Sequence, residues 1–243
     1  MIKGLYTSAS GMLPRIKKQE LTANNIANFS TPGYKRDTLF TRELSRAEKQ
    51  LALRRSDWEK PMVNEVYTDY TSGIFDKTGN PLDFAIDGDG FFTLELADGT
   101  RALTRAGSFT VNKDGLLAFP GGPLLIGEGG PIEVGNGKVT VAQSGEVDVD
   151  GFVIGRIVPM TVADLDQVQK IGSSLFVVPE GVELIPVDKA TIRQGYLEAS
   201  NVDIVREMID MIISFRNYEA NARALQAQDQ TLQHLFNRVG GNG

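Results

Sequence analysis

Residues 92–104, FTLELADGTRALT, decide the fold of the central part of the chain. Apolar and polar residues alternate in Phe92–Leu96, the chain turns at Asp98-Gly99, and a second run follows in Arg101–Thr104. An Asp-Gly pair between two such runs is a strong hairpin signal, because glycine accepts the positive φ that the favoured turn requires. The stretch therefore predicts two antiparallel strands.

The same pattern occurs twice more in residues 71–199. The runs and their turns are Ser108–Val111 and Leu116-Leu117 around Asp114-Gly115, and Lys138–Val141 and Val147–Val149 around Ser144-Gly145. Repeated short runs of period two, each ending in a turn signal, are typical of an all-β domain. We interpret residues 71–199 as a central antiparallel β-rich domain whose single helical stretch is Val162–Val168.

Both ends of the chain carry a different period. In residues 1–34 and 200–243 apolar side chains recur every three or four positions, which is the heptad pattern of helices that pack along a seam. The predicted seam consists of Leu5, Ala9, Met12, Ile16, Ala23 and Ile26 at the N-terminus, and of Ile204, Met208, Met211, Phe215, Tyr218, Ala222, Leu225, Asp229, Leu232, Phe236 and Val239 at the C-terminus.

The length of the C-terminal stripe favours partner helices over a globular core. It lasts about five heptads and predicts a helix of about 50 Å, longer than a compact domain usually needs. We expect an α+β fold in which the two terminal helices pair as a coiled-coil-like domain. Asp229 is the charged residue of the C-terminal seam, where a polar side chain would set the register of packing at some cost in stability.

Local signals indicate where the helices begin and end. Pro14 lies inside the N-terminal stripe, so the first helix either bends there or begins near it. Pro32 disfavours helical geometry at Thr31, so the chain leaves the first helix shortly before it. Ser200 or Asn201 is the expected N-cap of the second helix.

Residues 35–70 connect the N-terminal helical segment to the central β-rich domain. Leu44, Ala47 and Leu51 predict a short helix there, and Pro61 is expected to end it.

Composition excludes several classes of protein. The net charge of −6 makes nucleic acid an improbable partner. The absence of cysteine removes any disulfide framework or cysteine metal site. The N-terminus lacks the apolar stretch of a secretory signal, and no run is long enough to cross a membrane. We expect a protein that is cytosolic or exported without a cleaved signal.

The sequence offers no constellation typical of an enzyme. The sole histidine, His234, stands on the predicted C-terminal helix without a positioned partner. Residues 87–90, DGDG, lack the third oxygen ligand and the closing glutamate of a calcium loop, and no phosphate-binding glycine motif occurs. We predict no catalytic residue, no cofactor and no metal. A β-rich enzyme with helical dimerisation arms is the alternative from another class.

Longer motifs resemble one protein family along nearly the whole chain. The N-terminal segments ANNIAN (23–28) and STPGYK (30–35) resemble those of flagellar rod and hook proteins. So do the central segments TGNPLD (78–83), IDGDGFF (86–92) and TRAGSF (104–109), and the C-terminal segments GYLEASNVD (195–203) and RNYEAN (216–221). The residues that carry the terminal motifs are Asn24, Asn25, Asn28, Thr31, Pro32, Gly33, Tyr34, Asn201 and Val202.

The resemblance implies a structural subunit of the flagellar basal-body rod. Such a subunit would polymerise through its terminal helices into a tube that transmits torque from motor to hook, and would pass through the flagellar export apparatus. Its partners would be other rod subunits and copies of itself, and its location would be periplasmic in a cell with two membranes. The chain length and the single compact β domain resemble rod subunits rather than the larger hook protein. Among rod subunits we expect the proximal one, and a distal rod or hook-related subunit is the alternative.

Overall fold

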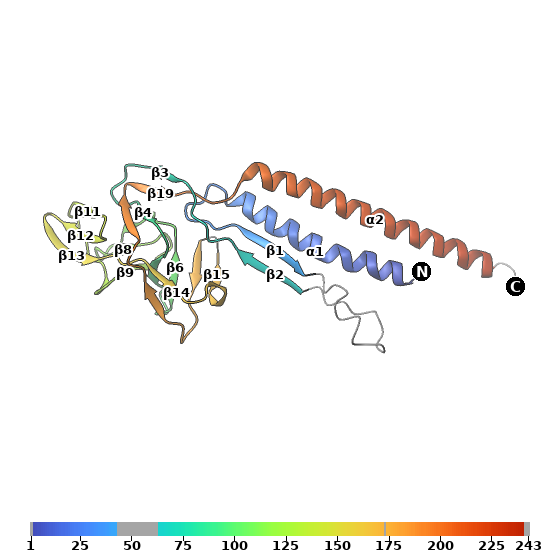
Figure 1. The fold of residues 1–243 in the computed structure, drawn as a ribbon, viewed down its shortest axis with the longest axis horizontal. Coiled ribbons are helices and arrows are strands. Elements are labelled where there is room, and N and C mark those ends of the chain that lie inside the picture. Colours follow the sequence, from blue (N-terminus) through green and yellow to red (C-terminus); the bar gives the residue numbers. More distant parts are fainter. Residues whose placement is uncertain (1, 43–62, 173, 241–243) are drawn as a thin grey trace. The chain divides into compact units, whose positions relative to one another are not determined.

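The computed structural model describes residues 2–42, 63–172 and 174–240, which form two compact units (Figure 1). The helical unit contains helices α1 (Ile2–Ala27) and α2 (Ile204–Gly240) together with strands β1 (Asp37–Arg42) and β2 (Val63–Thr68). The β unit contains residues 28–36 and 70–202. The expected fold class, terminal helices in contact with each other and a central antiparallel β region between them in the sequence, is confirmed.

The β unit is built from short strands joined by turns. Its strands are β3 (Phe75–Lys77), β4 (Phe84–Asp87), β5 (Phe92–Glu95), β6 (Arg101–Thr104), β7 (Thr110–Val111), β8 (Leu117–Ala118), β9 (Leu124–Gly127), β10 (Gly130–Pro131), β11 (Val139–Val141), β12 (Glu146–Val149), β13 (Phe152–Arg156), β14 (Met160–Val162), β15 (Gln169–Ile171), β16 (Leu175–Val177), β17 (Leu184–Pro186), β18 (Thr191–Gln194) and β19 (Tyr196–Glu198). The three predicted hairpins are confirmed as β5–β6, β7–β8 and β11–β12. In place of the helical stretch expected at 162–168 there is one 3-10 turn, η2 (Leu165–Gln167).

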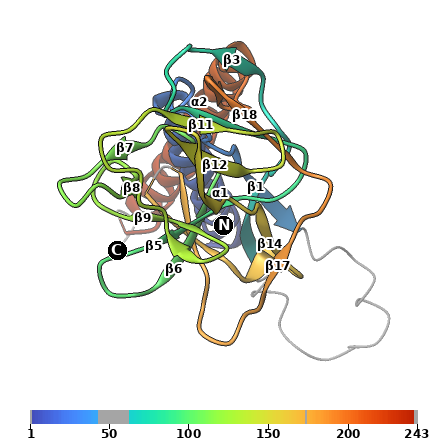
Figure 2. The same cartoon turned by 90° about the vertical axis from the view of Figure 1, so that its left-hand side faces the viewer.

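All strand pairs of the described residues are antiparallel. The largest sheet has eight strands in the order β15-β16-β6-β5-β9-β8-β7, with β10 paired to β9. A three-stranded sheet, β11-β12-β13, and the pairs β14–β17, β18–β4 and β19–β3 complete the unit. Figure 2 shows β8 and β9 on one side of the β unit and the β14–β17 pair on another.

Two apolar clusters fill the β unit. The larger one contains Phe84, Phe92 and Phe109, with Phe92 and Phe109 packed edge to face at 5.4 Å between ring centroids. The smaller one is centred on Phe91 and Phe176. Alternation along the strands of a twisted sheet directs these side chains inward, which is the burial that the period of two predicts.

The helix ends differ from the predictions in two details. α1 begins at Ile2 and passes through Pro14, so the alternative of a helix that starts near Pro14 is wrong. The N-cap of α2 is Asp203 rather than Ser200 or Asn201: its Oδ1 accepts from the amides of Val205 (3.0 Å) and Arg206 (3.1 Å). Asp203 takes this place because α2 begins one residue after it, at Ile204.

The described parts of the segment between α1 and the central β-rich region form a pair of antiparallel strands. β1 and β2 pair in register from Asp37 opposite Thr68 to Arg42 opposite Val63, and β1 contacts α1. Figure 1 shows the hairpin beside α1 within the helical unit. The short helix expected around Leu44, Ala47 and Leu51, and its end at Pro61, lie outside the described residues.

Gly107 marks the closest backbone approach in the β unit. Its carbonyl accepts from the amide of Phe84 at 2.9 Å, and a Cβ at this position would lie 1.6 Å from the Phe84 carbonyl oxygen. The two segments carry core aromatic residues on either side, so neither backbone is able to move away without opening the core.

We expect Gly107→Ala to lower the free energy of unfolding by roughly 2–4 kcal/mol, because the new methyl group has to displace backbone. Chemical denaturation followed by circular dichroism measures the change. Gly129→Ala is the matched control, since a Cβ there meets no atom within 4 Å. Equal stability of the two variants would contradict the close approach.

Candidate functional site

The contact between α1 and α2 is polar at its centre. The two helices lie side by side in the helical unit (Figure 1). Ser214 on α2 donates to the carbonyl oxygen of Arg15 at 3.3 Å, and Lys18 pairs with Asp210 at 3.5 Å. Ser214 is only 5% exposed, so this hydroxyl lies in the interface rather than at its rim. The face of α2 that meets α1 therefore places polar side chains among half-buried apolar ones, unlike the apolar seam of an ordinary coiled coil.

Asn25 and Glu207 form a buried polar link in the same unit. Asn25 donates from Nδ2 to the carbonyl oxygen of Asp37 (2.9 Å) and accepts at Oδ1 from the Asp37 amide (3.0 Å), which ties α1 to the first residue of β1. The same Nδ2 lies 3.3 Å from Glu207 Oε2 on α2. Both side chains are 1% exposed. One amide thus joins α1, α2 and the hairpin, which explains why an asparagine of the ANNIAN motif stands at this position.

The opposite face of α2 is apolar and uncovered. Over about three turns of the helix it presents six large side chains that are between 48% and 64% exposed: Val205, Met208, Ile209, Ile212, Ile213 and Phe215. We call these six residues the outer face. Beyond Phe215 this side of the helix turns polar, with Arg216, Arg223 and Gln226 exposed. A monomer rarely exposes so many contiguous apolar side chains, and such a patch marks an interaction surface.

The structure divides the predicted seam between these two faces. Met208 and Phe215 belong to the outer face, and Ile16 and Ala23 of α1 are exposed as well. The half-buried members are Met12, Ile26, Ile204, Met211, Tyr218, Ala222 and Leu225. For Leu5, Ala9, Asp229, Leu232, Phe236 and Val239 the structure places the backbone on α1 or α2 and describes no side-chain environment. The role of Asp229 therefore stays a prediction.

The terminal motifs meet in the β unit. After α1 the chain makes two turns, in which the amides of Thr31 and Tyr34 donate to the carbonyl oxygens of Asn28 and Thr31. Gly33 then donates its amide to the carbonyl oxygen of Glu198 at 2.7 Å, with φ +67°, and a Cβ there would lie 2.1 Å from the Ala106 amide nitrogen. Only glycine satisfies both conditions.

A second bond joins the same two segments of chain. Asn201 Oδ1 accepts from the Arg36 amide at 2.8 Å. The two stretches through which the chain enters and leaves the β unit are therefore bound to each other.

A buried cluster of charges lies where these stretches meet. The Glu198 carboxylate accepts from Lys35 Nζ at 2.6 Å, from the Gly73 amide at 3.0 Å and from Arg105 Nη1 at 3.1 Å. The exposed fractions of the Glu198, Lys35 and Arg105 side chains are 0%, 1% and 3%. Lys35, Arg105 and Glu198 all lie within the motifs that resemble the flagellar proteins, but no local sequence pattern indicated a role for them.

Backbone carbonyl groups complete the cluster. Lys35 Nζ also donates to the carbonyl oxygen of Thr71 at 2.6 Å, and Arg105 donates to those of Ile86 (3.1 Å) and Gly88 (2.7 Å). Burial lowers the pKa of Arg105 below its usual value, while the charge of Glu198 opposes that shift. Two buried cations thus share one carboxylate and draw further stabilisation from oriented carbonyl dipoles.

Beside the cluster, Tyr34 is held by a third cation. Lys170 Nζ lies 4.1 Å from the centroid of the Tyr34 ring and donates to the carbonyl oxygen of Lys35 at 2.7 Å. Tyr34 is 2% exposed. The STPGYK motif is therefore a docking segment whose last three residues are buried in the β unit.

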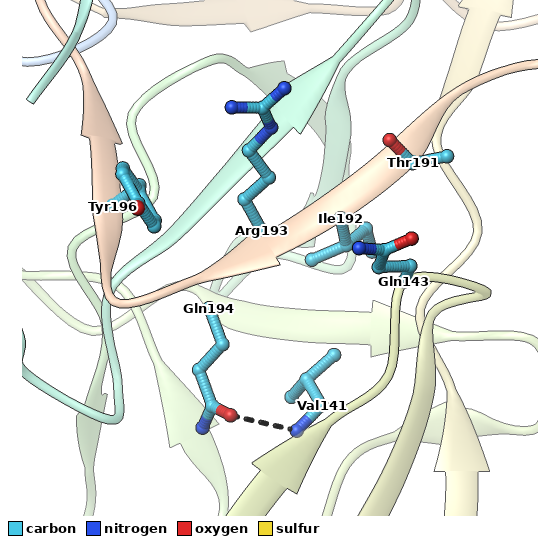
Figure 3. A pocket seen from close by; sticks show the side chains of 7 residues that line it. All are labelled: Val141, Gln143, Thr191, Ile192, Arg193, Gln194 and Tyr196. Carbon is cyan, nitrogen blue, oxygen red and sulfur yellow. Dashed lines mark hydrogen bonds between the residues drawn. The ribbon is translucent and has the colours of Figure 1, made fainter. Parts of the chain in front are cut away.

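The β unit contains a pocket of about 450 Å³ (Figure 3). It is lined by Val141, Gln143, Thr191, Ile192, Arg193, Gln194 and Tyr196. Gln194 bridges the strands, because it accepts from the Val141 amide and donates to two carbonyl oxygens. Arg193 pairs with Asp87. The lining supplies no carboxylate or imidazole to act as a general base.

We expect Glu198→Gln to lower the free energy of unfolding by about 3–5 kcal/mol, because it preserves shape but leaves Lys35 and Arg105 buried without a counter-charge. Chemical denaturation provides the measurement. Glu20→Gln is the control: Glu20 pairs with Lys17 at 3.1 Å on the surface, and its loss should cost less than about 1 kcal/mol. A Glu198 variant as stable as the control would show that the cluster does not stabilise the association of the segments around Lys35 and Glu198.

Comparison with known protein families finds matches near both ends and in the middle of the chain. Three family descriptions match: "Flagella basal body rod protein" at residues 5–35, "Flagellar hook protein FlgE/F/G D1 domain" at 85–149 and "Flagellar basal body rod FlgEFG protein C-terminal" at 193–238. Within the described residues, no helix is both long and apolar enough to cross a membrane.

Individual relatives match from end to end. The chain is 33% identical to the flagellar basal-body rod protein FlgF of Caulobacter vibrioides, over 99% of both chains. It is 30% identical to the rod protein FlgG of Bacillus subtilis, over 98% of this chain and 99% of the relative. It is also 29% identical to the hook-basal body complex protein FlhO of Bacillus subtilis, over 99% of both. The chain therefore belongs to the flagellar basal-body rod family, whose members are structural axial subunits of the motility apparatus and not enzymes.

Proposed function

We propose that the chain builds the flagellar rod by packing the outer face of α2 against the terminal helices of neighbouring subunits. The observation that carries this proposal is the exposed apolar face of α2, which lies opposite a partly polar contact with α1. Its inner side meets α1 through Glu207, Asp210 and Ser214, while the six apolar side chains of the outer face remain exposed. In an isolated helix pair the outer face of α2 stays in water and contributes no stability. In a bundle both faces of the helix are covered, so both contribute.

The energetics support assembly through this surface. Burying the exposed half of each large apolar side chain contributes about 1 kcal/mol, so the six together offer several kcal/mol per subunit once a neighbour covers them. The polar inner face adds specificity instead, because a buried amide and carboxylate accept few alternative registers. The other predicted seam residues, Asp229 included, would extend the contact along the helix.

The contact has consequences for the assembly as a whole. A surface that meets a different surface on the next subunit does not close on itself and generates an open helical array. Such an array of this chain and other rod subunits would be a tube that carries torque from the motor to the hook. We propose the flagellar export apparatus as the route by which the subunit reaches the rod.

The first test replaces Ile209 and Ile212 together with Gln. We expect a folded subunit with unchanged thermal unfolding that fails to enter basal bodies and leaves cells non-motile, because the outer face no longer gains from burial. Motility in soft agar and the subunit content of purified basal bodies are the measurements.

The matched control replaces Ile171 and Ile185, which are similarly exposed isoleucines of the β unit, with Gln. This variant should assemble as the natural chain does. Normal assembly of the Ile209 and Ile212 variant would exclude the outer face as the assembly surface.

We further propose a place in the proximal rod. The chain has 243 residues, and its alignment with FlgF spans 247 positions, whereas that with FlgG of Bacillus subtilis spans 271. The alignment with FlgF therefore contains fewer gaps in this chain than the alignment with that FlgG. A compact β unit of this kind supports a rod subunit over a hook-related one.

Position along the axis is tested by imaging. A small tag inserted between Gly121 and Gly122 keeps both glycines, whose φ angles are +99° and +112°, and a Cβ at either position meets no atom within 4 Å. Labelled basal bodies viewed by electron microscopy should carry the label at the end of the rod nearest the motor. A label at the hook end would assign the chain to the distal rod.

A further inference from the structure

Residues 28–36 belong to the β unit although they are separated in the sequence from the rest of it, residues 70–202. In the part of the chain that the structure describes, they contribute no strand to the sheets of the unit and no side chain to either apolar cluster. We call residues 28–36 the docking loop. Because the sheets and the clusters are built without it, the loop is held in the β unit by the contacts of its own residues.

The docking loop has a shape of its own. Asn25 binds both the amide and the carbonyl oxygen of Asp37, so the residues that flank the loop are bound to each other. Within the loop the amides of Thr31 and Tyr34 close two turns, and Pro32 restricts the backbone further. A short loop with adjoining ends and internal turns is compact by itself. This preformed shape lowers the entropy that is lost when the loop binds.

The surface that receives the loop selects two residues by their shape. At Gly33 a Cβ would lie 2.1 Å from the Ala106 amide nitrogen, so a side chain at this position has no room. The ring of Tyr34 lies 4.1 Å from Lys170 Nζ, measured to the ring centroid, and the residue is 2% exposed. An ammonium group over an aromatic face is a specific contact, because the face of the ring carries partial negative charge.

Lys35 is selected by its charge. Its Nζ lies 2.6 Å from Glu198 Oε1 and 2.6 Å from the Thr71 carbonyl oxygen. A compact ammonium ion with three donors suits two such acceptors better than the planar fork of a guanidinium does. Without Lys35, Glu198 would still accept from Arg105 Nη1 at 3.1 Å and from the Gly73 amide at 3.0 Å. The carboxylate therefore keeps an opposite charge when the loop is absent.

We propose that residues 70–202 form a binding site for peptides that contain Gly-Tyr-Lys, and that the docking loop occupies this site as a segment able to leave it. The closed form dominates in the free chain. In the minor open form the loop is released, the Glu198 carboxylate is exposed to water, and the sheets and apolar clusters stay folded. The site does not involve the outer face of α2, so it is independent of the assembly proposed above.

Hydrogen exchange of the natural chain tests the release of the loop. The amides of Gly33 and Arg36 donate to acceptors outside the loop, whereas those of Phe84 and Leu117 donate within the larger apolar cluster. After correction for intrinsic rates, the two loop amides should exchange about 100-fold faster than the two cluster amides, because a local opening costs less than global unfolding. Equal protection of all four amides would overturn the proposal.

A peptide of residues 28–36, NFSTPGYKR, tests the site itself. In the full-length double variant Tyr34→Ala, Lys35→Ala the loop of the chain lacks both the ring and the ammonium group, so the site is open. Fluorescence anisotropy of the labelled peptide should give a Kd on the order of 0.1 mM for this variant. The natural chain should bind the peptide at least about 10-fold more weakly, because its own loop competes at a high effective concentration.

Matched variants test the specificity of the site. In the peptide, Gly33→Ala and Lys35→Met should each weaken binding at least about 10-fold, because a methyl group collides or a charge is lost. Ser30→Ala should leave binding unchanged, since Ser30 is exposed. In the double variant of the chain, Lys170→Met should weaken binding several-fold, while Lys113→Met, at an exposed lysine of another turn, should have no effect.

Three further results would overturn the proposal. One is a folded double variant that does not bind the peptide, and another is equal binding of the Gly33→Ala peptide. The third is loss of cooperative unfolding in the double variant, which would show that the loop is required for folding and does not merely occupy a site. Adding Ile209→Gln and Ile212→Gln should leave peptide binding unchanged even where assembly is lost, so failure of the rod proposal is distinguishable from failure of this one.

Discussion

The carboxylate of Glu198 lies within hydrogen-bonding distance of Lys35, Arg105 and the Gly73 amide, and all three charged side chains are almost completely buried. Lys35 belongs to the stretch by which the chain enters the β unit after α1, and Glu198 to the stretch by which it leaves for α2. One anion therefore binds two distant parts of the sequence inside the same core. Buried ion pairs add little net stability, but removing one partner is costly, so this arrangement specifies a single conformation.

The neighbouring contacts explain why the surrounding residues are so restricted. Gly33 has a positive φ and abuts the backbone at Ala106, and its amide binds the Glu198 carbonyl oxygen. Tyr34 fills the space beneath Lys170. Each of these residues satisfies a steric or hydrogen-bonding condition set by the entry and exit of the chain, which is a structural demand rather than a catalytic one.

The contact between the two helices contains buried polar groups, while large apolar side chains lie on the outside of α2. Asn25, Glu207 and Ser214 lie between or beneath the helices, while Ile209 and Ile212 are exposed. For a subunit that acts alone, the outer face would stay in contact with water and would add nothing to stability, since burial is the main favourable contribution to folding. In the function proposed above, the two sets of groups would have separate tasks: polar groups would define how the helices pair, and apolar groups would contact neighbouring subunits.

Much of the fold was predictable from the sequence alone. The Asp-Gly turns at 98-99 and 114-115 determined two hairpins, because turn chemistry and alternation are local properties. The two terminal helices and their pairing followed from heptad spacing, and the motifs of both ends indicated the family.

Local patterns could not show which face of α2 meets α1. A three-four repeat describes a stripe, and Met208 and Phe215 fitted it although they point away from α1. The β1–β2 hairpin was missed because its strands are separated by residues 43–62, so no short turn signal joins them. The charge cluster was hidden for the same reason: Lys35, Arg105 and Glu198 are far apart in the sequence, and only tertiary folding buries them together, since a buried charge requires a partner whose position no local rule specifies.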